Sequence, residues 1–354
     1  MIETGQPLVS NWKLITHPRV ITLLFLGFSA GLPLLLIFSS LSLWLREAGT
    51  ERAAVTYFSW AALGYSFKFI WAPLIDQLPL PVLARRLGRR RSWMLVAQSG
   101  IVLSILAMAA IDPKAGESAL VWMAFAAVAL GFSSATQDIV IDAYRIESAE
   151  VDLQAMMSAS YIAGYRIGML VAGAGSLYLA DWFGSSSDVY RYEAWAMTYS
   201  AMALMMGVGI ATTLLISEPA VTRPKEALQS SQDYARFLLL FAIAVGGFIS
   251  IFYFSGDFVD AVRLSLGELF ANHFLSAFLV ELLRLALALT VAWLLALLLV
   301  RIGVVEYRTF EHTYLMPIRD FFRRYGWSLA WLLLALIGTY RISDIVLGVI
   351  SNVF

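Results

Sequence analysis

The chain has 354 residues, of which 60% are hydrophobic and 14% are charged, and its formal net charge at pH 7 is zero. Soluble domains average roughly 45–50% apolar and about 25% charged residues, so this composition excludes an ordinary soluble protein and predicts a polytopic membrane protein. The zero net charge argues against nucleic acid as a partner. The lack of cysteine excludes disulfides and thiolate metal sites, and His17, His273 and His312 are too far apart in sequence to form a metal motif.

Nine apolar runs follow one another along the chain, and each has about the 20 residues that a bilayer-spanning helix needs. The first run is too long for the core of a signal peptide and lacks a clear small-residue cleavage site, so we expect it to be a span. The sequence therefore predicts an all-α polytopic helix bundle with about nine spans. The runs cover residues 20–45, 53–75, 93–111, 120–144, 155–180, 194–216, 237–258, 274–300 and 327–353.

The distribution of positive charge predicts the orientation, because cytoplasmic loops collect Lys and Arg. With the N-terminus in the cytoplasm, most of the Lys and Arg residues outside the runs fall on the cytoplasmic side. The largest group is in the loop 76–91, between the second and third runs. We therefore predict a multi-pass protein with a cytoplasmic N-terminus.

The polar segment 217–232, with Pro219 and Pro224, is typical of a hinge between bundles. We expect a six-helix bundle at 1–220, followed by the hinge and two extra helices at 221–305. The extra pair is nearly all Leu, Ala and Val, and a helix that is apolar all round faces lipid or is deeply buried. We interpret the pair as peripheral.

The last part of the chain, 306–354, differs in composition from the extra pair. Residues 306–324 are charged and aromatic, and they predict an interfacial amphipathic helix leading into the ninth span. Transporters usually pair two related halves around a site at the bilayer midplane. The ninth span is therefore interpreted as the first helix of an incomplete C-terminal half, and we expect the chain to be a truncated form.

The segment ATQDIVIDAYRIE, residues 135–147, places three charged side chains near the end of a long apolar run. Asp138, Asp142 and Arg145 are spaced i, i+4 and i+7, so they share one face of a helix. Ionisable residues within a span usually face the bundle interior or a water-filled cavity, because exposing them to lipid is costly. This face is the main candidate for a solute pathway.

Helical rise places Asp138, Lys68 and Arg166 at comparable depths on three different predicted helices. One interpretation is a cavity in which Arg166 and Lys68 face an anionic substrate and Asp138 carries a proton or serves as counter-ion. The other is a fixed ion pair that fastens the helices together. Asp142 and Arg145 lie nearer the cytoplasm, and both assignments stay open for them: Asp142 as a second proton-coupling residue, or a gate-side charge cluster with Asp76, Arg89, Arg90 and Arg91.

Other candidate residues have equally open interpretations. The Gln137 amide can bond a sugar or peptide, or it can join neighbouring helices. Tyr161 and Tyr165 can stack on sugar rings, or they can belong to the core. Arg341 and Asp344, spaced i, i+3 in the ninth run, either neutralise each other or add a binding and a proton-coupling group to the site. Glycines around Tyr165 (Gly164 and Gly168) predict close helix contact.

The chain has no phosphate-cradling G-x-x-x-x-G-K-[ST] loop, no nucleophile elbow and no metal motif. We therefore expect a secondary active transporter that is not an enzyme and uses no cofactor. Its energy then comes from an ion gradient, and a titratable Asp138 or Asp142 suits a proton.

Several segments carry a resemblance to a known family. Together with the basic loop between the second and third helices, they resemble the major facilitator superfamily and, within it, the AmpG muropeptide permease family. The segments are FSAGLPLLL (28–36), YSFKFIWAPLID (65–76), ATQDIVIDAYRIE (135–147) and GYRIGMLVAGAG (164–175).

The resemblance implies a six-helix N-terminal half, two extra helices between the halves, and a place in the bacterial inner membrane. It implies proton-driven import of GlcNAc-anhydromuramyl peptides from the periplasm for peptidoglycan recycling, with the muropeptide, protons and the lipid bilayer as partners. Two alternatives stay open: a permease for another anionic solute, such as a coenzyme A thioester or a sugar acid, and a membrane assembly factor that moves no solute.

Overall fold

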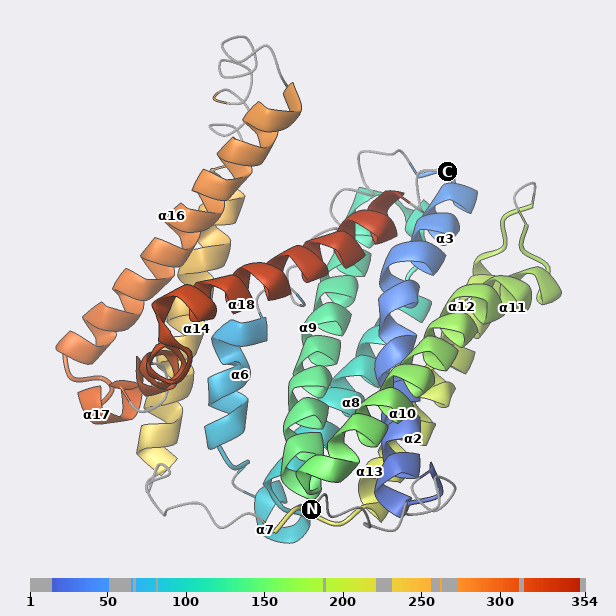
Figure 1. The fold of residues 1–354 in the computed structure, drawn as a ribbon. Helices are drawn as coiled ribbons and strands as arrows, with labels where there is room; N and C mark the ends of the chain where they lie inside the picture. Colours follow the sequence, from blue (N-terminus) through green and yellow to red (C-terminus); the bar gives the residue numbers. More distant parts are fainter. Residues whose placement is uncertain are drawn as a thin grey trace. The chain divides into compact units, whose positions relative to one another are not determined.

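A computed structural model describes residues 15–50, 65, 68–80, 82–186, 189–220, 231–255, 262, 273–311 and 315–350. All regular secondary structure in these residues is helical (Figure 1), so the predicted all-α class is confirmed. The chain divides into two compact units, and each is described by itself. The first unit comprises residues 1–223 and 334–354, and the second comprises residues 224–333.

The first unit is a bundle of long helices that run side by side (Figure 1). Two of its helices are interrupted by short π-helical turns, η1 and η3, and then continue. Its elements are α2 (Pro18–Leu35), η1 (Leu36–Ser40), α3 (Leu41–Glu47), α6 (Lys68–Gln77), α7 (Leu83–Leu87), α8 (Arg89–Ala109), η2 (Pro113–Ala115), α9 (Glu117–Ser148), α10 (Val151–Leu170), η3 (Val171–Gly175), α11 (Ser176–Trp182), α12 (Tyr192–Met205) and α13 (Gly207–Leu215).

Five helices among the described residues are long and apolar enough to cross a membrane, which confirms a polytopic membrane protein. They match the first and the third to sixth predicted runs, with ends that differ by a few residues. Of the second predicted run, 53–75, only Tyr65 and 68–75 are described. The five helices are Pro18–Glu47, Arg89–Ala109, Glu117–Ser148, Asp152–Trp182 and Tyr192–Leu215.

These helices carry large apolar side chains on their outer faces as well as inside the bundle. Leu103, Trp122 and Leu170 are each about two-thirds exposed, while Ser29, Gln98 and Gln137 have no exposed surface. A soluble helix shows the opposite distribution, with polar residues outward. The arrangement fits helices whose outer faces meet hydrocarbon.

The continuous helix α2–η1–α3 contributes much of the core. Trp44 on α3 stacks on Trp195 of α12 with ring centroids 5.6 Å apart, and Tyr199 lies 4.8 Å from Trp44. All three aromatic side chains are fully buried. The Tyr199 hydroxyl donates a hydrogen bond of 2.8 Å to the carbonyl oxygen of Leu36, in the π-helical turn.

Glycines allow α2 and α10 to touch along their backbones. A β-carbon added at Gly27 would lie 2.2 Å from the Tyr161 carbonyl oxygen, and one at Gly164 would lie 1.9 Å from that of Leu24. Real β-carbons do not approach backbone oxygens so closely, so only glycine fits at these positions. The small-residue spacing seen in the sequence therefore sets this helix crossing.

The second unit contains α14 (Ser231–Phe254), α16 (His273–Arg301), α17 (Tyr307–Phe310) and the first part of α18 (Met316–Ile350). Helices α14 and α16 correspond to the predicted extra pair. Gly326 has a φ of 72° and breaks α18 between an aromatic, arginine-containing arm and an apolar continuation. That break lies where the sequence predicts an interfacial helix to pass into the ninth span, and the membrane position stays a prediction.

Candidate functional site

A buried carboxylate of the first unit lies between a cation and a phenol. Asp138 on α9 faces Lys68 on α6, with Nζ 3.7 Å from Oδ2, and the Tyr161 hydroxyl of α10 donates to Oδ1 at 3.3 Å. The side chain of Asp138 is 8% exposed and that of Lys68 is 26% exposed. We call Lys68, Asp138 and Tyr161 the inner site. Both distances exceed those of a tight charge-assisted hydrogen bond.

The helix crossing explains why Tyr161 reaches Asp138. The Tyr161 carbonyl rests against Gly27, so α10 lies as close to α2 as two helix backbones can. The face of α10 that carries Tyr161 is thereby held next to the face of α9 that carries Asp138. The inner site is thus built from sequence-distant helices through a small-residue contact.

Three more predicted residues lie on the same helices. Gln137 is fully buried, and its Nε2 donates to the Ser29 hydroxyl at 3.4 Å. The Tyr165 ring is 6.0 Å from that of Tyr161. Arg166 is exposed, and its guanidinium contacts the sulfur of Met169 at 3.9 Å instead of joining Asp138. The structure therefore brings Lys68 to Asp138 and leaves Arg166 accessible on α10.

Asp142 and Arg145 form a separate pair one turn from the inner site. Their charged atoms are 3.4 Å apart, and the Asp142 side chain is 51% exposed. Arg145 also donates to the hydroxyl of Ser158 on α10. Among the described contacts, Arg145 does not reach Asp76 or the arginines of α8. The predicted residues Arg341 and Asp344 lie on α18, and their side chains fall outside what the structure describes.

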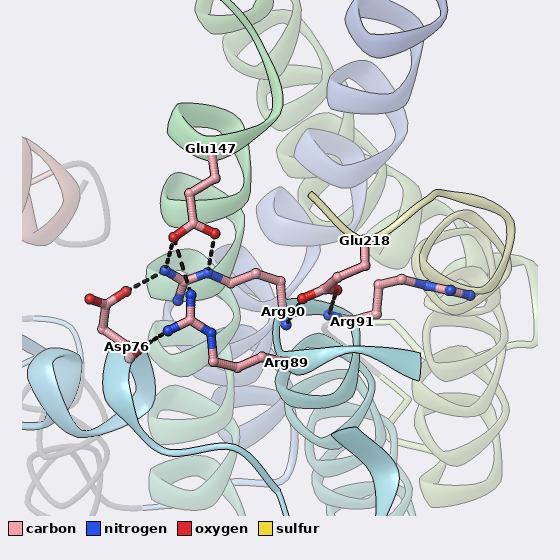
Figure 2. A network of polar contacts seen from close by, with 6 residues as sticks. All are labelled: Asp76, Arg89, Arg90, Arg91, Glu147 and Glu218. Atoms are coloured by element: carbon pink, nitrogen blue, oxygen red, sulfur yellow. Dashed lines mark hydrogen bonds and ion pairs between the residues drawn. The ribbon is translucent and has the colours of Figure 1, made fainter. Parts of the chain in front are cut away.

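A dense charge network occupies the end of the bundle where α6 and α9 end and α8 begins (Figure 2). The guanidinium of Arg90, only 1% exposed, donates to Asp76 and to both carboxylate oxygens of Glu147, at 2.6 Å and 2.9 Å. Arg89 donates to Glu147 at 3.2 Å and to the Asp76 carbonyl. We call Asp76, Arg89, Arg90, Glu147 and Glu218 the end cluster.

Glu218, in the segment after α13, binds the start of α8. Its two carboxylate oxygens accept hydrogen bonds from the backbone N–H groups of Arg90 and Arg91, at 2.8 Å and 3.1 Å (Figure 2). These amides have no helical partner, and a carboxylate there also interacts favourably with the helix dipole. In return, the Arg91 guanidinium donates to the last carbonyls of α13. The two helix ends cap each other.

Gly88 is essential to this geometry for two reasons. Its φ of 87° lies in the region that L side chains rarely adopt, and a β-carbon there would lie 2.4 Å from the Glu218 side chain. The glycine therefore ends α7, starts α8 and leaves room for the capping carboxylate.

The sequence analysis named Asp76, Arg89 and Arg90 but missed Glu147 and Glu218. Glu147 follows Arg145 closely in the motif 135–147, and its position near the end of a predicted span opposite a basic loop was the available signal. Glu218 stands in the predicted hinge, where an acidic residue gives no sign that it caps a helix from another part of the chain. The roles of Glu147 and Glu218 both depend on contacts with α8, which is far from them in sequence.

Comparison with known proteins shows that this chain is similar to proteins described or named as transporters. Residues 19–192 match the family model described as "Acetyl-coenzyme A transporter 1". "Putative transporter AmpG 4" of Rickettsia felis is 38% identical over 218 residues, which are 62% of this chain and 50% of that protein. "Anhydromuropeptide permease" of Escherichia coli K12 is 37% identical over 213 residues, which are 60% of this chain and 40% of that protein.

The matched region is homologous to the AmpG-type permeases. The resemblance stated from the sequence motifs is thereby confirmed, and these relatives are named as a putative transporter and a permease. The chain spans about half the length of the curated relatives it matches. Both the inner site and the residues of the end cluster other than Glu218 lie in the part matched by the family model.

Proposed function

We propose that this chain belongs to a proton-driven permease that imports GlcNAc-anhydromuramyl peptides across the bacterial inner membrane, with its N-terminus in the cytoplasm. The observation that carries the proposal is Asp138, a carboxylate with 8% of its side chain exposed, placed inside a membrane-length helix beside Lys68. The relative named as an anhydromuropeptide permease supports the substrate.

In this mechanism, the protonation of Asp138 alters its pairing with Lys68. The ionised carboxylate attracts the ammonium group, while the protonated form loses that attraction and keeps its hydrogen bond with Tyr161. Protonation thus releases Lys68 to interact with an anionic substrate. The exposed Arg166 and the ring of Tyr165 are the proposed substrate contacts on α10, and Gln137, Arg341, Asp142 and Asp344 remain candidates with no assigned step.

A second substrate class has its own support, because the matched family model is described as an acetyl-coenzyme A transporter. Coenzyme A thioesters carry phosphate groups that would also pair with Lys68 and Arg166. Both candidates are anionic, so the inner site alone does not separate them. The substrate must be tested directly.

The experiment measures uptake of labelled anhydromuropeptide and of labelled acetyl-coenzyme A in vesicles that lack their own permease. The chain is compared with a form extended to twelve core helices, each with and without a proton uncoupler. We expect anhydromuropeptide uptake that the uncoupler abolishes, in the extended form at least. Uptake of acetyl-coenzyme A instead would replace the substrate, and no uptake by correctly inserted protein would refute transport.

A further inference from the structure

Three fully buried polar side chains lie close together inside the first unit, apart from the inner site, and a fourth lies on α13, one helical turn from Gly209. Ser29 of α2, Gln98 of α8, Gln137 of α9 and Thr213 of α13 each have 0% exposed surface. A β-carbon at Gly209 of α13 would lie 2.7 Å from the Ser29 hydroxyl and 3.1 Å from Gln98 Nε2. The Gln98 amide and the Ser29 hydroxyl therefore both pack against Gly209 and lie near each other. Gln137 joins them through its 3.4 Å contact with Ser29.

Most of the polar atoms in this group lack a protein partner. Both amide atoms of Gln98, the Oε1 of Gln137 and the Oγ1 of Thr213 make no hydrogen bond within the described part of the chain. Thr213 lies one turn from Gly209, so it shares a face of α13 with it. Buried side-chain polar atoms in folded proteins nearly always have a partner, and four unpartnered ones from three helices require an explanation.

We propose that this group is a binding site for ordered water inside the helix bundle. The unpartnered atoms include an obligatory donor, Gln98 Nε2, as well as acceptors. Water both donates and accepts, so it satisfies the whole set. Buried waters typically make about three hydrogen bonds to such groups.

A metal cation fits this set less well. It binds oxygen atoms only and would leave the Gln98 donor unsatisfied, and the four side chains offer no negative charge to offset its own. Gly209 has a clear role in this arrangement, since a β-carbon there would clash with Ser29 and push it and the Gln98 amide away from α13. The inference rests on burial and bonding alone and does not depend on the substrate or on proton coupling.

The test is a structure of the full chain in a lipid nanodisc at a resolution that shows ordered water. We expect density at hydrogen-bonding distance, about 2.7–3.2 Å, from the Gln98 amide and from Gln137 Oε1 or Thr213 Oγ1. The Gln98→Met variant should lose this density, whereas Ser104→Ala, at another buried position on α8, should keep it.

Two results would overturn the proposal. In one, the glutamines bond directly to each other or to Thr213, and no density lies between them. In the other, the density contacts oxygen atoms only, at about 2.3–2.6 Å as a cation does, and changes when sodium is exchanged for potassium. If Gln98→Met does not fold, the wild-type structure and a Thr213→Val variant still distinguish these outcomes.

Discussion

The inner site and the end cluster both pair cations with carboxylates between helices, but their geometry differs. In the inner site, Asp138 lies 3.7 Å from Lys68 and 3.3 Å from the Tyr161 hydroxyl. In the end cluster, the 1% exposed Arg90 contacts both oxygens of Glu147 at 2.6 Å and 2.9 Å and also reaches Asp76. One site holds its charge loosely, and the other fixes it from several sides.

This difference indicates a division of roles. A carboxylate whose contacts with its cation and its phenol are as long as those of Asp138 can gain or lose a proton at a smaller structural cost than one held by short bonds. A buried guanidinium that is bonded to two carboxylates cannot lose a partner without leaving an uncompensated charge in a low-dielectric region. We therefore expect changes at the inner site to affect uptake, and changes at the end cluster to affect stability.

The largest expected effect is on uptake in Asp138→Asn. The amide keeps an acceptor for Tyr161 but cannot exchange a proton, so proton-driven uptake should fall by about a hundredfold, as on loss of a proton-transfer group. The melting temperature in detergent should change little. The exposed Asp152→Asn on α10 is the control. Unchanged uptake in Asp138→Asn would remove the inner site from the proposed mechanism.

The next effect is a loss of stability in Glu147→Gln. The variant leaves Arg90 buried with a weaker set of partners, and removing one member of such a pair costs about 3 kcal/mol. Denaturant unfolding in detergent measures the difference, with Arg86→Gln on the exposed face of α7 as the control. If uptake per folded molecule fell while stability held, the end cluster would have the role assigned here to the inner site.

A smaller loss of stability is expected for Gly164→Ala. Its methyl group would meet the Leu24 carbonyl, so α2 and α10 must separate, at a cost of about 2 kcal/mol for overpacking. The separation should also move Tyr161 away from Asp138 and reduce uptake. Gly207→Ala is the matched control, because a β-carbon there meets nothing within 4 Å. Equal stability of the two variants would argue against the close crossing.

The smallest expected effect is a pH-dependent loss of stability in Tyr190→Phe, at the end of the bundle away from the end cluster. Burial raises the pKa of the Tyr190 phenol, and its 2.7 Å hydrogen bond to Asp112 raises it further. The unfolded chain therefore loses the phenol proton at a lower pH than the folded chain does. The stability that the Tyr190 hydroxyl contributes is complete below about pH 10 and is lost as the pH rises above that value. Tyr190→Phe should lower stability by about 1 kcal/mol at pH 7, and the difference from wild type should shrink in alkali. A difference that stays constant with pH would contradict this.

Much of the architecture could be predicted from the sequence. Apolar runs near 20 residues predicted the long helices, because a span must satisfy its backbone internally and meet hydrocarbon outside. Glycines in GYRIGMLVAGAG predicted close packing, and Gly164 and Gly168 do lie against α2. The quoted motifs also predicted the similarity to AmpG-type permeases that the comparisons find.

The partners of the charged residues could not be predicted in the same way. Helical rise placed Lys68 and Arg166 at depths comparable to that of Asp138, yet of these two cations it is Lys68 that contacts it. Asp142 and Arg145 were weighed as part of the gate-side cluster, but the structure pairs them with each other. Depth along a helix follows from counting residues, whereas the direction of a side chain depends on how neighbouring helices are rotated.

The sequence by itself determined that this protein is an all-α membrane protein related to AmpG-type permeases, because hydropathy and short motifs are local properties of the chain. Only the tertiary structure decided that Glu147 and Glu218 hold the arginines of α8, and that Gln98, Gln137 and Thr213 are buried away from solvent. Those contacts join residues far apart in sequence, and the free energy of a buried charge or amide depends on the groups that folding brings around it.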